Sequence, residues 1–168
     1  VSIEGNVSSQ YISGLLFACS KASGNSMLTI TTELESKDYV GMTIDVMAQF
    51  GVSVEVQSNW RYIKVLGNQE YHSTEFHVEG DYSSASFLMA AGALSGDVVV
   101  SGLRKGSIQG DAEIASILRK MGASVRTVRE GVRVETSDLH ACTIDASHIP
   151  DLVPVLTLIA TQACLLYT

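Results

Sequence analysis

Serines at the start of apolar, helix-like runs are the first residues in this chain that could do chemistry. Ser8 and Ser9 precede Gln10 and an apolar run over residues 11–18, and Ser36 precedes a second such run. Serine side chains cap helices because their oxygens accept the unpaired N–H groups of the first turn. The same N–H groups and hydroxyls can also hold an anion. The spacing therefore predicts either plain helix caps or an anion site at these positions.

One carboxylate has a comparable position. Asp151 follows Ile149 and Pro150 where a further helix is expected to begin, because proline is favoured at the first helical position. The helix dipole stabilises a charged carboxylate there, and such a group can act as a base toward a hydroxyl. The alternative is a first-turn Asp that only caps its helix. The four histidines are scattered along the chain, so no metal site is expected.

Composition excludes several classes of protein. The formal net charge is −7 and no run of Lys or Arg occurs, which argues against a nucleic-acid partner. The three cysteines are odd in number and widely spaced, which favours reduced thiols and a cytoplasmic location over a disulfide framework. No signal peptide opens the chain and no apolar run reaches about 18 residues, so no membrane contact is expected. Both ends fall inside expected elements, which suggests a piece of a larger protein.

The elements that would position these residues form a repeat. The order βαβαββ occurs twice, with Gly5 and Gly80 at equivalent positions and Gly51 and Gly122 forming a second matched pair. A repeat of this kind is a fold-level signal, and the alternative is two unrelated α/β modules. A third unit is expected from residues 143–145, with its first helix near Pro150. Hydrophobic periodicity predicts helices over residues 9–22, 36–50, 83–94 and 111–121, and strands over 1–5, 27–32, 52–57, 62–66, 75–78, 97–101, 125–128 and 132–135.

Six short motifs follow one another over almost the whole chain. They are Ser8-Ser9-Gln10, Ser36-Lys37-x-Tyr39, Val78-Glu79-Gly80-Asp81-x-Ser83-Ser84-Ala85, Ser107-x-Gln109-Gly110-Asp111, Lys120-Met121-Gly122-Ala123 and His148-Ile149-Pro150-Asp151. Taken together and in this order, the motifs resemble the 5-enolpyruvylshikimate-3-phosphate synthase family. The chain departs from the family pattern at Asp38, where the family usually has proline, and over residues 165–168.

The resemblance implies an α/β (α+β) fold of the enolpyruvyl transferase type. That family has two lobes, each of three βαβαββ units, with helices packed inside and sheets outside. Residues 1–79 would end the first lobe, which binds shikimate 3-phosphate, and residues 80–168 would begin the second lobe. The chain would cross between lobes near residues 79–82.

The resemblance also implies an activity. The family transfers the enolpyruvyl group of phosphoenolpyruvate to the 5-hydroxyl of shikimate 3-phosphate, without a cofactor, in the shikimate pathway. The parent enzyme is expected to be a monomer. The 168-residue chain alone is expected to be inactive, since much of the family's phosphoenolpyruvate site lies elsewhere, and to associate through uncovered apolar surface. The alternatives are a fragment similar to the UDP-N-acetylglucosamine enolpyruvyl transferase and a non-catalytic structural or phosphate-binding fragment.

By resemblance, Ser8, Ser9 and Ser36 would bind the phosphate of shikimate 3-phosphate, and Tyr39 its ring portion. Gln10 would contact both substrates, including phosphoenolpyruvate. Asp151 would bind the ring hydroxyls and is the candidate catalytic base. The second serine pair, Ser83 and Ser84, is expected only to cap a helix, as are Asp81 and Asp111, and Gln109 and Gly110 are expected to be structural.

Overall fold

The computed structural model describes residues 1–163, and within the chain it separates two compact units. The first unit is Val1–Phe76 and the second begins at His77. Within residues 1–163, no helix has the length and apolar character needed to cross a membrane.

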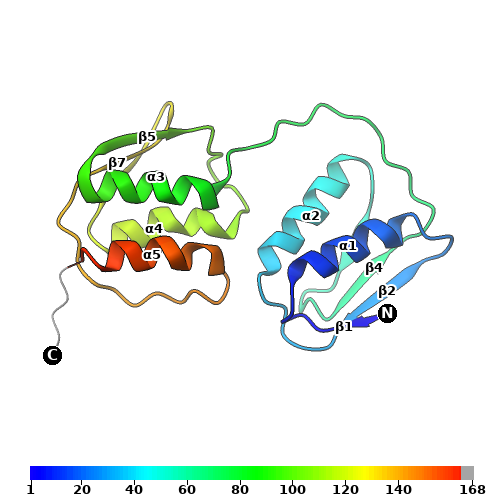
Figure 1. Ribbon diagram of the computed structural model, residues 1–168. Helices are drawn as coiled ribbons and strands as arrows, with labels where there is room; N and C mark the ends of the chain where they lie inside the picture. Colours follow the sequence, from blue (N-terminus) through cyan, green and yellow to red (C-terminus); the bar gives the residue numbers. More distant parts are fainter. Residues whose placement is uncertain (164–168) are drawn as a thin grey trace. The chain divides into compact units, whose positions relative to one another are not determined.

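The first unit confirms the predicted βαβαββ order. Its elements are β1 (Ser2–Ile3), α1 (Ser9–Ser20), β2 (Ser26–Ile30), α2 (Lys37–Gln49), β3 (Val54–Val56) and β4 (Tyr62–Val65). The four strands form one sheet in the order β1-β2-β4-β3, in which β1 and β2 are parallel and the other pairs are antiparallel. Both helices cover one face of this sheet (Figure 1).

Side-chain periodicity explains this two-layer packing. Leu28 and Ile30 point into the core while Met27 is exposed, as expected when alternate strand residues face opposite sides of a sheet. Ile12 and Leu16 are one helical turn apart in α1 and are fully buried against that sheet. One apolar face from each element is therefore enough to close the core of the first unit.

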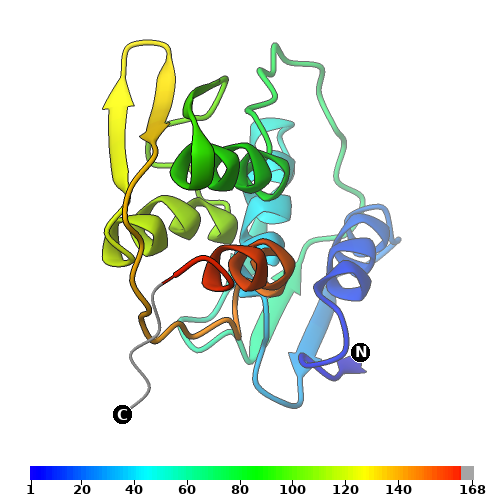
Figure 2. The same cartoon turned by 60° about the vertical axis from the view of Figure 1, so that its left-hand side comes forward.

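The second unit has a three-stranded antiparallel sheet in the order β5-β7-β6, with helices on one face. In Figure 2, α3 (green) and α4 (yellow-green) lie beside the yellow hairpin of β6 and β7, and α5 (red) packs against α3. The elements are α3 (Tyr82–Ser95), β5 (Asp97–Ser101), a 3-10 turn η1 (Gly110–Glu113), α4 (Ile114–Lys120), β6 (Ser124–Val128), β7 (Gly131–Glu135), a 3-10 turn η2 (Pro150–Leu152) and α5 (Val153–Ala160).

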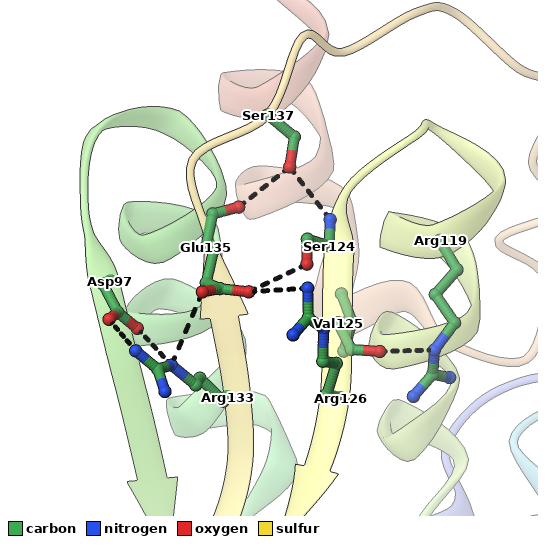
Figure 3. Close-up of polar contacts among 8 residues, drawn as sticks. All are labelled: Asp97, Arg119, Ser124, Val125, Arg126, Arg133, Glu135 and Ser137. Carbon is green, nitrogen blue, oxygen red and sulfur yellow. Dashed lines mark hydrogen bonds and ion pairs between the residues drawn. The ribbon is translucent and has the colours of Figure 1, made fainter.

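The solvent-facing side of the second sheet carries a ladder of charges (Figure 3). Arg133 donates through Nε and Nη2 to the two carboxylate oxygens of Asp97 on the neighbouring strand, and its Nε lies 3.7 Å from Glu135 Oε1. Glu135 also accepts a hydrogen bond from the Ser124 hydroxyl at 3.0 Å and pairs with Arg126 at 3.4 Å. These cross-strand contacts fix the register while Val132 and Val134 fill the core on the other side.

Two expected strands are absent from the described part of the chain. Residues 75–78 form no ladder, so the second unit lacks the counterpart of β1. The sequence has β-type residues there, but a strand forms only when a neighbour supplies backbone partners. Residues 143–145 likewise form no strand, although Ile144 packs against the core. The helix expected near Pro150 is confirmed, since η2 leads into α5.

Candidate functional site

Parallel pairing of β1 and β2 brings the two serine motifs of the first unit to one edge of the sheet. Ser2 lies opposite Thr29, and Ile3 opposite Ile30. Because the carboxyl ends of parallel strands meet at the same edge, α1 and α2 both begin there (Figure 1). Residues far apart in the sequence thus share one end of the unit.

The loops that lead into the two helices are tied together. The Gly5 N–H donates to the Thr32 hydroxyl at 2.8 Å, and the Gly5 carbonyl accepts from the Glu35 N–H at 3.2 Å. The Thr32 hydroxyl in turn donates to Asn6 Oδ1 at 3.1 Å. A Cβ on Gly5 would lie 2.7 Å from the Glu33 carbonyl oxygen, so the close approach requires glycine.

Ser8 and Ser9 occupy the start of α1. Ser8 is its N-cap, and its Oγ accepts a hydrogen bond from the Gln10 N–H at 3.2 Å. Ser9 is the first helical residue; both serines are half-buried, and Gln10 is exposed to solvent. The capping role predicted for this motif is therefore confirmed at Ser8, and the amides of this helix start lie at the surface of the unit.

Ser36 takes the N-cap position of α2 but does not cap it. Its backbone is left-handed, with φ 51° and ψ 38°, and its side chain makes no capping hydrogen bond. The plain capping interpretation is therefore wrong for Ser36. A left-handed backbone costs a residue with a Cβ about 1–2 kcal/mol, so the surrounding loop holds this serine in place. The charges beside it are of opposite sign, the exposed Lys37 and the half-buried Asp38.

Tyr39 lies half-buried in the first turn of α2, next to a polar bridge between the two helices. The Tyr39 carbonyl accepts a hydrogen bond from the Thr43 hydroxyl at 3.0 Å, and that hydroxyl lies 2.8 Å from the hydroxyl of Ser13 in α1. The bridge fixes α1 against α2 close to their starts. The structure thus brings Ser8, Ser9, Gln10, Ser36 and Tyr39 to one edge of the first unit.

Asp151 belongs to the second unit and is exposed in the turn η2. The buried side chains of Ile149 and Leu152 anchor this turn to the core. Pro150 precedes Asp151 and sets the backbone for the first turn. The carboxylate is therefore presented to solvent by a fixed helix start.

The second serine motif is already occupied by a carboxylate. Asp81 is the N-cap of α3 and accepts from the Ser83 N–H at 3.2 Å and the Ser84 N–H at 2.9 Å. Hydrogen bonding to Ser84, followed by that to Ser83, holds the pKa of the Asp81 carboxyl below its ordinary value, and burial opposes this shift. The capping role predicted for Asp81 is confirmed.

The role predicted for Asp111 is wrong, because it caps no helix. The N-cap of η1 is Gln109, and Asp111 lies inside the turn, 2% exposed, where it accepts a hydrogen bond from the Ser83 hydroxyl. The Gln109 side chain accepts from the Tyr82 N–H at 2.8 Å and donates to the Gly80 carbonyl at 2.9 Å. Gln109 therefore holds the entry to α3.

Sequence reasoning gave no site role to three residues that shape the first site, namely Gly5, Asn6 and Thr32. The repeat paired Gly5 with Gly80, but only as a signal of the fold. No comparable signal marks Thr32, whose partner is distant in sequence. Within residues 1–163, no cluster of three or more His, Cys, Asp or Glu side chains is placed to hold a metal ion.

Comparison with known proteins connects this geometry to one family. The family model described as EPSP synthase (3-phosphoshikimate 1-carboxyvinyltransferase) matches residues 1–168. Curated relatives named 3-phosphoshikimate 1-carboxyvinyltransferase include those of Clostridium novyi, 43% identical over 94% of this chain, and of Clostridioides difficile, 40% identical over 95%. The chain spans 36% of the length of either relative.

Solved structures share the fold. The EPSP synthase from Acinetobacter baumannii aligns with a TM-score of 0.69 at 24% identity, covering 97% of this chain and 38% of that one. The enolpyruvyl transferase NikO from Streptomyces tendae aligns with a TM-score of 0.64 at 15% identity, over 96% of this chain and 42% of its own. With the family model matching from end to end, the chain belongs to the EPSP synthase (3-phosphoshikimate 1-carboxyvinyltransferase) family.

Proposed function

We propose that this chain supplies the shikimate 3-phosphate-binding part of a transferase that moves the enolpyruvyl group of phosphoenolpyruvate to the 5-hydroxyl of shikimate 3-phosphate. The observation that carries the proposal is the pair of helix starts, with Ser8, Ser9 and Ser36, at one edge of the first unit. Amides and hydroxyls at a helix start bind phosphate groups, and the helix dipole favours the negative charge.

The conformation of Ser36 supports a binding role over a capping role. A residue kept in a strained backbone region persists where its surroundings require that geometry, and such residues gather at ligand sites. Its hydroxyl does not cap α2, so capping does not explain why the loop holds it there. In this proposal Ser36 joins Ser8 and Ser9 around the phosphate, Tyr39 contacts the ring, and Gln10 contacts both substrates.

We assign to Asp151 the role of the base that accepts the proton of the reacting 5-hydroxyl. A neutral alcohol is a poor nucleophile, and a carboxylate within hydrogen-bond reach can accept its proton. In this proposal the Asp151 carboxylate accepts the proton of the 5-hydroxyl in an active site from which water is excluded during the transfer step. The rest of the phosphoenolpyruvate site would come from parts of the enzyme outside this chain, so the 168 residues alone should bind shikimate 3-phosphate without turnover.

The location we propose is the cytoplasm. Cys19 and Cys142 are free thiols in the described part of the chain, as a reducing compartment maintains them. The substrates are small phosphorylated acids, and no cofactor is part of the proposed reaction.

Calorimetric titration of shikimate 3-phosphate into wild type, Ser9→Ala and Ser36→Ala tests the binding part. Each substitution removes one hydroxyl and should weaken shikimate 3-phosphate binding at least about tenfold, because a hydrogen bond to a charged group contributes about 1.5–3 kcal/mol. Ser84→Ala is the matched control, since it lies in the second copy where Asp81 already holds the amides. Binding that is unchanged in the first two variants, or tighter binding of UDP-N-acetylglucosamine, would overturn the proposal.

The catalytic part is tested in the full-length enzyme that carries this sequence. Asp151→Asn should lower kcat by about 10²–10⁴, the usual contribution of a general base. Retained shikimate 3-phosphate binding with lost turnover would support the assignment. Turnover equal to wild type would remove Asp151 from the chemistry.

A further inference from the structure

The two copies of the repeat begin their first helices at different points. Gly5 corresponds to Gly80, and Asn6 to Asp81. In the second copy Asp81 is the N-cap and α3 begins at the next residue, whereas α1 is capped by Ser8 and begins two positions later. The residues at this matching position therefore have different roles, since Asp81 caps its helix and Asn6 does not.

Asp81 fills the place that an anion would take in the second copy. Its two carboxylate oxygens accept from the N–H groups of Ser83 and Ser84. These amides correspond to those of Ser8 and Ser9 in the first copy. There, Asn6 Oδ1 instead accepts a hydrogen bond from Thr32, and no acidic residue lies in the first turn of α1.

Two serine hydroxyls of the second copy also donate to carboxylates. The Ser83 hydroxyl donates to Asp111, and the Ser107 hydroxyl donates to Glu79 Oε1 at 2.9 Å. Ser107 corresponds to Ser36, since each stands at the same distance before its repeat glycine, Gly122 or Gly51. The second copy thus has the same serine framework with internal carboxylates in it.

Differences at two matching positions explain why the serine amides of the first copy are left for a phosphate. The position of Asp111 corresponds to Val40, which is fully buried and apolar, and the position of Asp81 corresponds to the neutral Asn6. A carboxylate within a few ångströms of a phosphate repels it, and a carboxylate that caps the helix removes the N–H donors the phosphate would use. Glu79 has a counterpart in Glu4, so the two copies differ in charge at the positions of Asp81 and Asp111, where the first copy has a neutral and an apolar side chain.

We propose that the side chain at this position determines which copy of the repeat accepts a phosphate. Neutral Asn6 leaves the Ser8 and Ser9 amides to shikimate 3-phosphate, and Asp81 closes the equivalent site at α3. Asn6 is in this sense a specificity-determining residue. The inference rests on the proposed binding of shikimate 3-phosphate at the first copy.

The test is Asn6→Asp in the full-length protein that carries this sequence, compared with Asn6→Ser. Both variants remove the amide, but only the first adds a charge, and its carboxylate can still accept from Thr32. Titration with shikimate 3-phosphate should give binding at least about tenfold weaker for Asn6→Asp than for Asn6→Ser, as like-charge repulsion at a few ångströms requires. Hydrogen exchange at the Ser8 and Ser9 amides should slow in Asn6→Asp as the new carboxylate caps them.

The outcomes separate the inference from the proposed function. If wild type does not bind shikimate 3-phosphate, the proposed function fails and the inference fails with it. If wild type binds and the two variants are equally weak, or Asn6→Asp binds like wild type, only the inference is overturned. Urea denaturation of both variants reports whether either is unfolded, and the exchange measurement gives a second readout that does not depend on ligand.

Discussion

A methyl group on Gly5 should separate the two helix starts that form the site. In Gly5→Ala the new Cβ would meet the Glu33 carbonyl oxygen and Ile30 Cγ2 at 2.7 Å, and the Leu34 Cα at 2.9 Å. Two of these three neighbours are backbone atoms, which cannot rotate away. The loops into α1 and α2 must therefore move apart, and with them Ser8, Ser9 and Ser36.

The size of the effect follows from this steric conflict. Overpacking a well-packed site costs about 1–3 kcal/mol, and the backbone neighbours place Gly5→Ala in the upper part of that range. Binding should suffer about as much as stability, because a displacement of about 1 Å in a positioning group can cost on the order of 100-fold, or about 2.7 kcal/mol. We expect a lower urea midpoint for unfolding of the first unit and shikimate 3-phosphate binding weaker by about that factor.

Gly14→Ala is the control for this experiment. Gly14 lies within α1, and a Cβ there has no neighbour within 4 Å. Alanine in a helix interior is favoured over glycine by about 0.5–1 kcal/mol, so this variant should be more stable than wild type. Urea denaturation and calorimetry of both variants provide the comparison. Gly5→Ala with the stability and affinity of wild type would refute the argument that contact between the two loops builds the site.

Two further predictions concern helix starts. Asp81→Ala should lower the free energy of unfolding by about 1 kcal/mol, because α3 loses its N-cap. The folded-state pKa of Asp81 lies below the ordinary 3.8. The difference in stability from wild type should therefore be full at neutral pH and vanish as the pH falls through that lowered pKa. Urea midpoints of wild type and Asp81→Ala that differ as much below that lowered pKa as at neutral pH would contradict this. Ser36→Gly should leave stability unchanged or raise it by up to about 1 kcal/mol, since glycine adopts the left-handed backbone without strain, while shikimate 3-phosphate binding falls; a clear loss of stability would show that the serine side chain supports the loop.

Local patterns in the sequence were enough for most elements and for the repeat. The apolar spacing of Ile12 and Leu16 predicted a helix over residues 9–22, and α1 spans Ser9–Ser20. The prediction of a strand at residues 75–78 was wrong, because strand propensity in the sequence does not supply a neighbouring strand to pair with. Asp111 was misassigned because a 3-10 turn begins at Gly110, after Gln109, and directs the carboxylate to the Ser83 hydroxyl instead of to a helix end.

The sequence by itself determined the repeated units, the family and the serines at helix starts, since each depends on residues close together in the chain. Only the tertiary structure decided that two of these starts share one edge, because parallel pairing joins segments such as those of Gly5 and Thr32, which are 27 residues apart. It also decided that Ser36 is left-handed and uncapped, and that carboxylates occupy the second copy. Those features arise from packing between loops, where the chain must satisfy backbone groups that no local pattern assigns.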